Sequence, residues 1–314
     1  MAEMVKKATR ESFGEALCAL AETNPDIVVL DADLAEATKT GIFKKQYPDR
    51  FFDCGIAEQN MVGIAAGLAA CGKIPFAASF AMFAAGRAFE QVRNSVGYPH
   101  LNVKIAGSHA GISVGEDGAT HQCCEDIALM RTIPGMVVLN PADHYEMQAA
   151  VKAAAEYVGP VYIRLGRLAV ESVNNNDDYT FEIGKGITLR DGKDITIIAT
   201  GLLVQEAVKA AKALEAAGID ARVLDIHTIK PPDTELVLKA AQETGRIVVA
   251  EEHNVIGGLG EAVSSYLSEV CPTPVTKIGI YDEFGHSGPA VDLLKEFGLS
   301  AENIEATVKK VLGK

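Results

Sequence analysis

The chain has 314 residues, 48% of them hydrophobic, and its 42 acidic and 29 basic side chains give a net charge of -13. This length suits about two globular domains, and the negative charge, with no basic run to offset it, excludes a nucleic-acid-binding protein. The longest apolar stretch, residues 61–72, is shorter than the about 20 residues of a membrane-spanning helix, and the N-terminal residues lack the apolar core of a signal peptide. We therefore expect a cytoplasmic protein with no membrane partner, and its six cysteines, which form no CxxC pair, are expected to be free thiols.

Short runs of Val, Ile and Leu alternate with Ala-rich and Leu-rich amphipathic segments through the first half of the chain. The strand-like runs lie in residues 26–33, 75–79, 101–109, 135–141 and 160–167. The helix-like segments lie in residues 60–72, 86–96, 123–131 and 143–158. Continuous apolar strands between helices predict a parallel sheet with both faces covered. We therefore expect a first, doubly wound α/β domain over residues 1–172.

The alternation stops at a polar, Asn/Asp-rich segment, residues 171–180, which is typical of a linker. Residues 181–194 (FEIGKGITLRDGKD) predict a short hairpin on their Gly and Asp-Gly turns. The pattern of strands and helices then resumes. The sequence therefore predicts a linker and hairpin over residues 173–190 and a second, smaller doubly wound α/β domain over residues 191–314.

Ligands of open parallel sheets bind outside the carboxyl ends of the strands. Three predicted strand ends carry unusual residues: residues 51–55 lead to Glu58, residues 101–109 end with His109, and residues 160–167 contain Arg164 and Arg167. Glu58 opens a helix that is otherwise small and apolar. A carboxylate there stabilises the helix dipole by about 0.3–1 kcal/mol, which is one interpretation, and a catalytic role is the other.

The glycine-rich loop over residues 111–121 contains Glu116 and Asp117 and lies between His109 and His121. It is consistent with a tight surface turn, or with hydrogen bonding to a polyhydroxylated or phosphorylated substrate. A zinc site from His109, His121 and Cys123 fits no usual ligand spacing and lacks an evident fourth ligand. No metal site is therefore predicted in this chain.

Several phenylalanines gather in residues 75–89. Most are expected in the core, but one ring after a strand end could stack on a planar heterocycle.

Several motifs together resemble the C-terminal half of transketolase, the thiamine-diphosphate enzyme that moves two-carbon ketol units between sugar phosphates. They are GIAEQNMVGIAAG, the phenylalanine cluster, GSHAGISVGEDGATHQ, the PAD after VVLN, DIHTIKPPD and AEEHNVIGGLGEAV. The resemblance covers nearly the whole chain. The family combines a diphosphate-binding, a pyrimidine-binding and a C-terminal domain, and this sequence resembles the last two. The resemblance thus implies a pyrimidine-binding domain in residues 1–172 and a transketolase C-terminal domain in residues 191–314.

The resemblance implies a cofactor role for four residues. Glu58 matches the catalytic glutamate that hydrogen-bonds the cofactor's aminopyrimidine and activates the cofactor. We expect its apolar surroundings to keep its carboxyl protonated. Phe80 and Phe83 resemble the rings that stack on the pyrimidine, and Asp33 resembles an acid near the cofactor at the subunit interface.

The same comparison implies a substrate site. His109 and His121 resemble catalytic ligands of the substrate hydroxyls, and Asp117 resembles the residue that contacts the C2 hydroxyl. Arg10 and Arg167 resemble a clamp on the sugar's phosphate, to which a guanidinium can bond in a bidentate manner.

The sequence departs from the family pattern at a few positions. Some relatives have a tyrosine in place of Phe83 and another aromatic residue in place of Ala77. A phosphate-binding serine of the family falls near Ala37, where Thr38 is the only hydroxyl substitute. Phosphate affinity and the length of sugar accepted are therefore less firmly implied than the cofactor chemistry.

The GDG stretch and asparagine pair that hold Mg²⁺ and the diphosphate in thiamine enzymes are missing from this sequence. The resemblance therefore implies one half of a two-subunit transketolase. An N-terminal partner subunit would hold Mg²⁺ and the diphosphate, and this chain would form a homodimeric core. Three alternatives remain: the β subunit of a 2-oxo acid dehydrogenase E1, whose relatives lack this pair of histidines, a 1-deoxyxylulose-5-phosphate synthase-like fragment, and a non-catalytic regulatory subunit.

Overall fold

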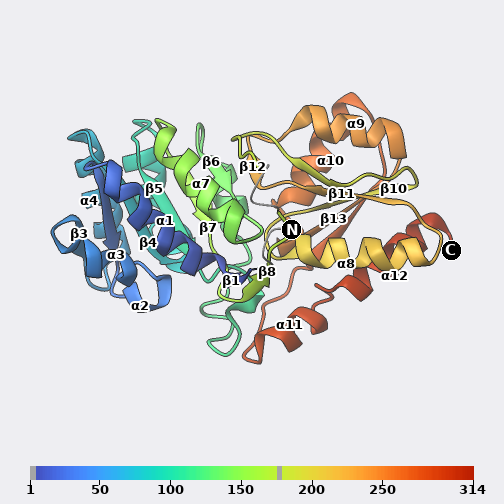
Figure 1. Ribbon diagram of the computed structural model, residues 1–314, viewed down its shortest axis with the longest axis horizontal. Helices are drawn as coiled ribbons and strands as arrows, with labels where there is room; N and C mark the ends of the chain where they lie inside the picture. The colour runs from blue at the N-terminus through green and yellow to red at the C-terminus, as the bar shows by residue number, and fades with distance from the viewer. Residues whose placement is uncertain (1–4, 175–178) are drawn as a thin grey trace.

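The computed structural model describes residues 5–174 and 179–314. Figure 1 shows two α/β units side by side along the long axis, the N-terminal half in blue to green and the C-terminal half in yellow to red. This arrangement confirms the predicted α/β architecture with mainly parallel sheets. No helix in the described ranges is long and apolar enough to cross a membrane.

The first sheet has the strand order β12-β6-β7-β5-β4-β2-β3. Its strands are β2 (Ile27–Asp31), β3 (Phe51–Asp53), β4 (Ile74–Phe80), β5 (Lys104–Ser108), β6 (Val137–Leu139), β7 (Val161–Arg164) and β12 (Thr228–Lys230). The strands pair in parallel, apart from β12, which runs antiparallel to β6. The carboxyl ends of β2, β4, β5 and β7 therefore lie at one edge of the sheet.

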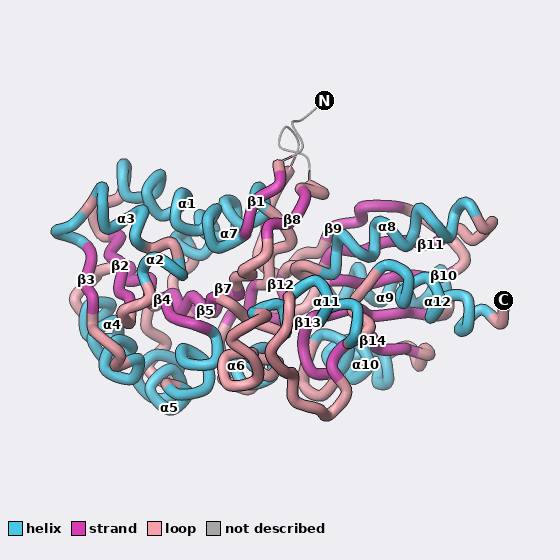
Figure 2. Tube along the Cα trace, turned by 90° about the horizontal axis from the view of Figure 1, so that it is seen from below, coloured by secondary structure: helices cyan, strands magenta, loops and turns pink. Residues whose placement is uncertain are grey.

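Helices cover both faces of this sheet, because its strands are apolar on both sides. In β2, Ile27 and Val29 pack in the core with one group of helices, and Val28 and Leu30 pack in the core on the opposite face. Figure 2 shows the two helical layers above and below the strands. One layer contains α1 (Thr9–Thr23), α2 (Ala35–Thr38), α3 (Gly41–Gln46) and α7 (His144–Glu156), and the other contains α4 (Glu58–Ala70), α5 (Phe89–Gln91) and α6 (Asp126–Arg131).

The second sheet has the strand order β14-β13-β10-β11-β9. Its strands are β9 (Ile187–Arg190), β10 (Ile195–Ala199), β11 (Ala221–Asp225), β13 (Ile247–Asn254) and β14 (Val275–Ile280). One face packs on α8 (Leu203–Ala216) and α12 (Ala301–Leu312), and the other packs on α9 (Thr234–Thr244) and α10 (Leu259–Val270). A further helix, α11 (Ala290–Glu296), packs against the loop that follows β5.

Two local predictions are wrong. The short hairpin expected in residues 181–194 does not form, because β9 pairs instead with the open edge of β11. Residues 221–228 were expected to belong to the second domain, and β11 (Ala221–Asp225) does, but β12, which begins at Thr228, joins the first sheet between the two units (Figure 1). Part of the predicted linker, residues 175–178, lies outside the described residues.

The described residues on either side of 175–178 contact the rest of the fold. A small separate sheet pairs β1 (Lys6–Ala8) with β8 (Ala169–Glu171). The hydroxyl of Tyr179 donates a 2.6 Å hydrogen bond to Glu146 of α7. All six cysteines lie within the described ranges and are free thiols, as predicted.

Candidate active site

Glu58 is the first residue of α4 and is 2% exposed. Its Oε2 accepts a 2.9 Å hydrogen bond from Nη1 of Arg87, which follows β4 in a π-helical turn, Met82–Arg87. The Arg87 guanidinium also lies over the ring of Phe83, 4.5 Å from its centroid. The predicted burial of Glu58 is observed, whereas the predicted apolar environment is incomplete because it contains this cation.

Four of the predicted residues form an aromatic cluster where β4 and β5 end. The rings of Phe80 and Phe83 are nearly parallel, with centroids 6.0 Å apart. The imidazole of His109 stacks on Phe80 at 4.0 Å. His121 lies edge-on to both phenylalanines, at 6.1 and 5.4 Å. The two ends of the glycine-rich loop therefore meet on the same pair of rings.

His109 has both ring nitrogens engaged. Its Nε2 lies 3.1 Å from Nη1 of Arg10, and its Nδ1 lies 2.8 Å from Oγ of Ser108. Because arginine can only donate, Nε2 accepts, and the proton of the neutral ring is on Nδ1. Burial, with the cations Arg10, Arg167 and Lys39, lowers the pKa of His109 to about 3. His109 is therefore a neutral hydrogen-bonding group at physiological pH.

The two arginines predicted as a phosphate clamp both act electrostatically on His109. Arg10 also donates from Nη1 to the carbonyl of Ala37 at 2.8 Å, and its buried Nε has no hydrogen-bond partner among the described residues. Arg167 donates to the carbonyl of Val114 and forms a 2.6 Å ion pair with Glu116. The arginine pair thus borders the aromatic cluster, with one guanidinium nitrogen still unsatisfied.

The remaining predicted residues are less engaged. Asp117 and Asp33 are exposed, and Asp33 has a left-handed backbone with φ 63°. Arg164, singled out at a strand end, is buried and bonds Asp126 through Nε at 2.8 Å, so it serves the core rather than the site.

Thr38 is not free to replace the family's serine. Its hydroxyl is buried and donates a 2.7 Å hydrogen bond to Oδ2 of Asp31, which also accepts from Thr40 at 2.8 Å. Burial raises the pKa of Asp31 to about 6, against the opposing effect of these hydrogen bonds. The structure therefore leaves Thr38 inside the fold.

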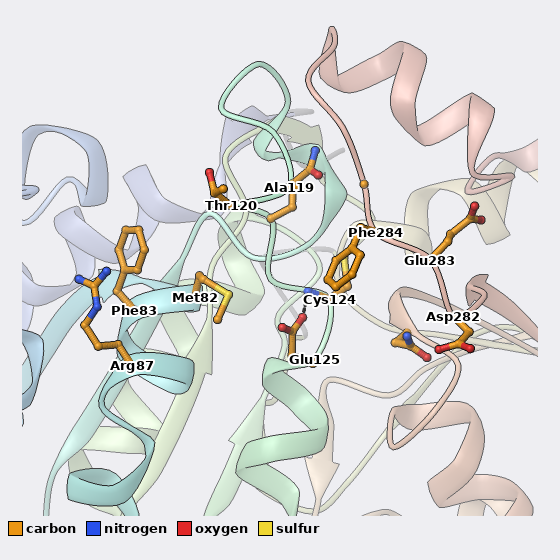
Figure 3. Close-up of a pocket in the computed structure, with 13 residues that line it drawn as sticks. Met82, Phe83, Arg87, Ala119, Thr120, Cys124, Glu125, Asp282, Glu283 and Phe284 are labelled. Carbon is orange, nitrogen blue, oxygen red and sulfur yellow. Dashed lines mark hydrogen bonds between the residues drawn. The ribbon is translucent and has the colours of Figure 1, made fainter.

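A pocket of about 690 Å³ opens beside Arg87 and Phe83. Figure 3 shows Met82, Phe83 and Arg87 on one side and Asp282, Glu283 and Phe284 of the second domain on the other. The Arg87 guanidinium, which lines this pocket, is paired with the Glu58 carboxylate. The pocket therefore offers the Phe83 ring and the Arg87 guanidinium to a bound ligand.

Sequence reasoning missed Arg87, Arg10's contact with His109, and the second-domain side of the pocket. Arg87 lies in the same Ala- and Phe-rich segment as Phe83, but nothing in that segment pairs it with Glu58, 29 residues away. The zinc alternative has no support, since both nitrogens of His109 have protein partners. Within residues 5–174 and 179–314, no group of three or more His, Cys, Asp or Glu side chains is arranged to hold a metal.

Comparison with known proteins gives two family matches. Residues 5–172 match the family "Transketolase, pyrimidine binding domain", and residues 184–304 match "Transketolase, C-terminal domain". The chain is 50% identical to "Putative transketolase C-terminal section" of Methanocaldococcus jannaschii, over 99% of this chain and 98% of the relative. It is 46% identical to "6-deoxy-6-sulfo-D-fructose transketolase subunit" of Clostridium sp. (strain MSTE9), over 96% of this chain and 94% of the relative.

A solved structure described as "Split gene transketolase, inactive beta4 tetramer" superposes with a TM-score of 0.91 and 55% identity, covering 98% of this chain and 99% of that chain. These relatives align with the chain over nearly their whole length and are named as transketolase sections or subunits. They favour transketolase over the dehydrogenase and synthase alternatives. The chain belongs to the transketolase family and is the C-terminal subunit of its split form, with a pyrimidine-binding and a C-terminal domain.

Proposed function

We propose that this chain, with an N-terminal partner subunit, forms a catalytic site that transfers a two-carbon ketol unit between anionic sugars. One observation carries the proposal: the rings of Phe80, Phe83, His109 and His121 form one cluster, and Arg87, which lies over Phe83 and lines the pocket with it, joins Glu58 to that cluster. A non-catalytic subunit would not require a buried carboxylate, parallel rings and a neutral imidazole in this arrangement.

The residues present fit the pyrimidine part of thiamine diphosphate. Phe80 and Phe83 offer aromatic faces, and Glu58 offers a buried carboxyl for a ring nitrogen. Thiamine diphosphate, when bound, supplies the carbon nucleophile that breaks and forms carbon–carbon bonds next to a carbonyl. Arg87 bonds only Oε2 of Glu58, so Oε1 of the same carboxyl would be the oxygen that faces a ring nitrogen.

The substrate would lie over the aromatic cluster. His121 would hydrogen-bond a sugar hydroxyl through its Nε2, and neutral His109 would do so by exchanging the contact of its Nε2 with Arg10 for a substrate hydroxyl. The exposed Asp117 is proposed to reach the C2 hydroxyl. Arg10 and Arg167, which border the aromatic cluster, would bind the anionic end through their guanidinium groups. Arg167 would exchange its ion pair with Glu116 for the substrate anion.

The anionic end need not be a phosphate. The Clostridium relative is named for 6-deoxy-6-sulfo-D-fructose, whose end group is a sulfonate. Guanidinium groups bind both kinds of oxyanion, and the buried Thr38 hydroxyl cannot add a phosphate-specific contact. A donor and acceptor panel should therefore include both sugar phosphates and sugar sulfonates.

A homodimeric core is supported by the outer face of α4. Ile56, which precedes this helix, is 78% exposed, and Ile64 is 39% exposed. Between them, Gly63 would have open space around an added Cβ, and Gly67 repeats this one turn later. An exposed face that combines apolar side chains with glycines suits close packing against a second copy. The partner chain, which we propose to carry Mg²⁺ and the diphosphate, would then flank the dimer.

Cytoplasmic location and a role in pentose phosphate metabolism are part of the same proposal. Six free cysteines accord with a reducing compartment.

Reconstitution tests this function. The purified chain with saturating Mg²⁺ and thiamine diphosphate should show no ketol transfer from xylulose 5-phosphate to ribose 5-phosphate. Activity should appear on titrating in an N-terminal partner and should saturate at one partner per chain, with assembly followed by light scattering. Robust turnover by this chain alone, or none at any partner ratio with the whole donor panel, would contradict the proposal.

A further inference from the structure

The loop between His109 and His121 is held by the second domain as well as by the first. Its base is closed within the first domain, where the amide of Gly111 donates a 2.8 Å hydrogen bond to the carbonyl of Cys123. The next residue, Ile112, is fully buried in the core of the second domain, with Leu293 and Leu294 of α11. The loop that carries the two histidines is therefore anchored across the junction of the two units.

Glu252 of β13 makes the central polar contact of this anchor. Its Oε1 accepts a 2.7 Å hydrogen bond from the backbone amide of Ser113, and the residue is 4% exposed. The main-chain carbonyl of Glu252 in turn accepts a 2.8 Å hydrogen bond from Nη2 of Arg164 in β7. The carboxylate is thus fixed at its base by the first sheet and bonded at its tip to the loop.

Gly111 permits the close approach of the Glu252 carboxylate to the loop. Gly111 has φ 85°, and a Cβ added there would lie 2.4 Å from both Cδ and Oε1 of Glu252. Any side chain at this position would displace the carboxylate from the Ser113 amide. The glycine and the glutamate are therefore complementary parts of one contact.

Contacts at the far end of the loop run to the same domain. The side-chain amide of Gln122 donates a 3.0 Å hydrogen bond to the carbonyl of His286. The amide of Asn254, two residues after Glu252, donates a 2.7 Å hydrogen bond to the carbonyl of Cys124. Each histidine is therefore followed, within a few residues, by a hydrogen bond to the second domain: Ser113 after His109, and Gln122 after His121.

We infer that Glu252 is a positioning residue, through which the C-terminal domain holds the histidine loop in the geometry that substrate binding requires. It acts through the Ser113 amide and Gly111, two residues after His109, and has no contact with substrate itself. The expected effect of Glu252 on catalysis rests on the proposed function. Its effect on the conformation of the loop does not depend on that proposal. The second domain would thus keep His109 and His121 in contact with the Phe80 ring.

The chain offers a matched control in the preceding residue. Glu251 is equally buried, but its carboxylate caps α10 by accepting from the amides of Leu259 and Gly260 at 2.7 and 2.8 Å. Glu251→Ala removes a buried carboxylate from the same strand without touching the loop. Glu252→Gln keeps an oxygen that can accept from Ser113, whereas Glu252→Asp is one methylene too short to reach it.

The first experiment measures amide hydrogen exchange of residues 110–121 in the isolated chain, where neither cofactor nor partner is needed. Glu252→Ala and Glu252→Asp should accelerate exchange of this segment by about tenfold or more, Glu252→Gln should stay close to the wild type, and Glu251→Ala should leave the segment unchanged. Unchanged exchange in Glu252→Asp, or equal acceleration by Glu251→Ala, would overturn the inference. If Glu252→Ala fails to fold, the Asp and Gln variants carry the same comparison.

The second experiment measures steady-state kinetics of the complex with the N-terminal partner. Glu252→Asp should raise KM for the sugar donor about tenfold, with Glu252→Gln restoring most of it, because the contact positions the substrate ligands. Equal KM values for Glu252→Asp and Glu251→Ala would contradict a positioning role. A wild-type complex without activity would refute the proposed function instead, and the exchange data would still decide the role of Glu252.

Discussion

Nη1 of Arg87 lies 2.9 Å from Oε2 of Glu58, and this ion pair covers the carboxylate on which the proposed cofactor chemistry depends. The arginine side chain is about half exposed, whereas the Glu58 side chain is 2% exposed. Removing the arginine would therefore leave a buried carboxylate without its cation, which is the costly way to break such a pair. In this structure the Glu58 carboxylate is thus buried and paired with a cation.

A double-mutant cycle measures this ion pair. Arg87→Met should lower the free energy of unfolding at pH 7, and the loss should be largely absent in a Glu58→Gln background, because no buried charge is then left unpaired. We expect a coupling energy of about 1 kcal/mol, since solvent screens the exposed arginine. Urea unfolding of the four proteins gives the value, and strictly additive effects would show that the pair does not stabilise the fold.

Glu58→Gln also tests the catalytic role. The amide keeps the shape and hydrogen bonding of the side chain but cannot share a carboxyl proton with the cofactor. We expect kcat of the reconstituted complex to fall by at least about a hundredfold, with assembly unchanged by light scattering. Glu215→Gln, the same change on the exposed surface of α8 in the second domain, is the matched control and should keep its activity. Near-normal turnover of Glu58→Gln would exclude Glu58 from cofactor activation.

Arg167→Ala should raise KM for phosphorylated or sulfonated donors far more than for hydroxypyruvate, which lacks the anionic tail, because the lost contact is to that tail. Glu116→Gln is the matched partner variant, since it frees Arg167 from its ion pair. It should lower KM for the same donors by no more than about fivefold, because solvent screens an exposed ion pair. An equal rise in KM for both donor types would remove Arg167 from the anion clamp.

The neutral state of His109 predicts a pH dependence of stability. Burial, with Arg10, Arg167 and Lys39, lowers its pKa to about 3 in the fold, whereas the unfolded chain binds a proton near pH 6.5. The stability associated with neutral His109 is therefore complete above about pH 6.5 and is lost as the pH falls toward 3. Between pH 7 and 5, wild type should lose about 2 kcal/mol more than His109→Asn in urea unfolding. Identical losses would show that His109 is protonated in the fold at pH 5.

A second pH dependence comes from two buried acids between α7 and β11. Burial raises the pKa of Glu146 to about 8 and raises that of Asp225 well above its usual range. Glu146 accepts from Tyr179 and from the amide of Ala142, whereas neither oxygen of Asp225 has a hydrogen-bond donor among the described residues. Burial without a donor disfavours the charged form of Asp225, so we expect this carboxyl to be protonated in the fold at neutral pH.

The variant Asp225→Asn tests whether Asp225 is protonated in the fold. An acid whose folded pKa is raised stabilises the fold below its unfolded pKa, and that stability is lost as the pH rises through the folded pKa. Wild type should therefore become less stable as the pH rises from about 4 toward 8, because burial raises the pKa values of both acids in the fold. The asparagine variant, which cannot ionise, should lose less stability over the same range, as measured by its melting temperature at pH 5, 7 and 9. Parallel curves would show that Asp225 is ionised in the fold.

Local sequence was sufficient for the architecture and for most candidate residues. Strands that are apolar on both faces, separated by amphipathic segments, specify helices on both sides of a parallel sheet, because each apolar surface must be buried. The place of Glu58 at the start of α4 is equally local. His109 and His121 were predicted together because one short glycine-rich loop connects them, so chain continuity keeps them close.

Only the tertiary structure decided the contacts that set the state of these residues. Arg87 reaches Glu58 across 29 positions, and Glu252 reaches Ser113 across 139. Thr38 hydrogen-bonds the buried Asp31 instead of facing the substrate region. These pairs depend on which elements pack side by side, and helix or strand periodicity carries no information on that choice. The same reason explains the errors at β9 and β12: the sequence showed short strands there, but which strand edge each would join was determined by where the packed sheets left an edge open.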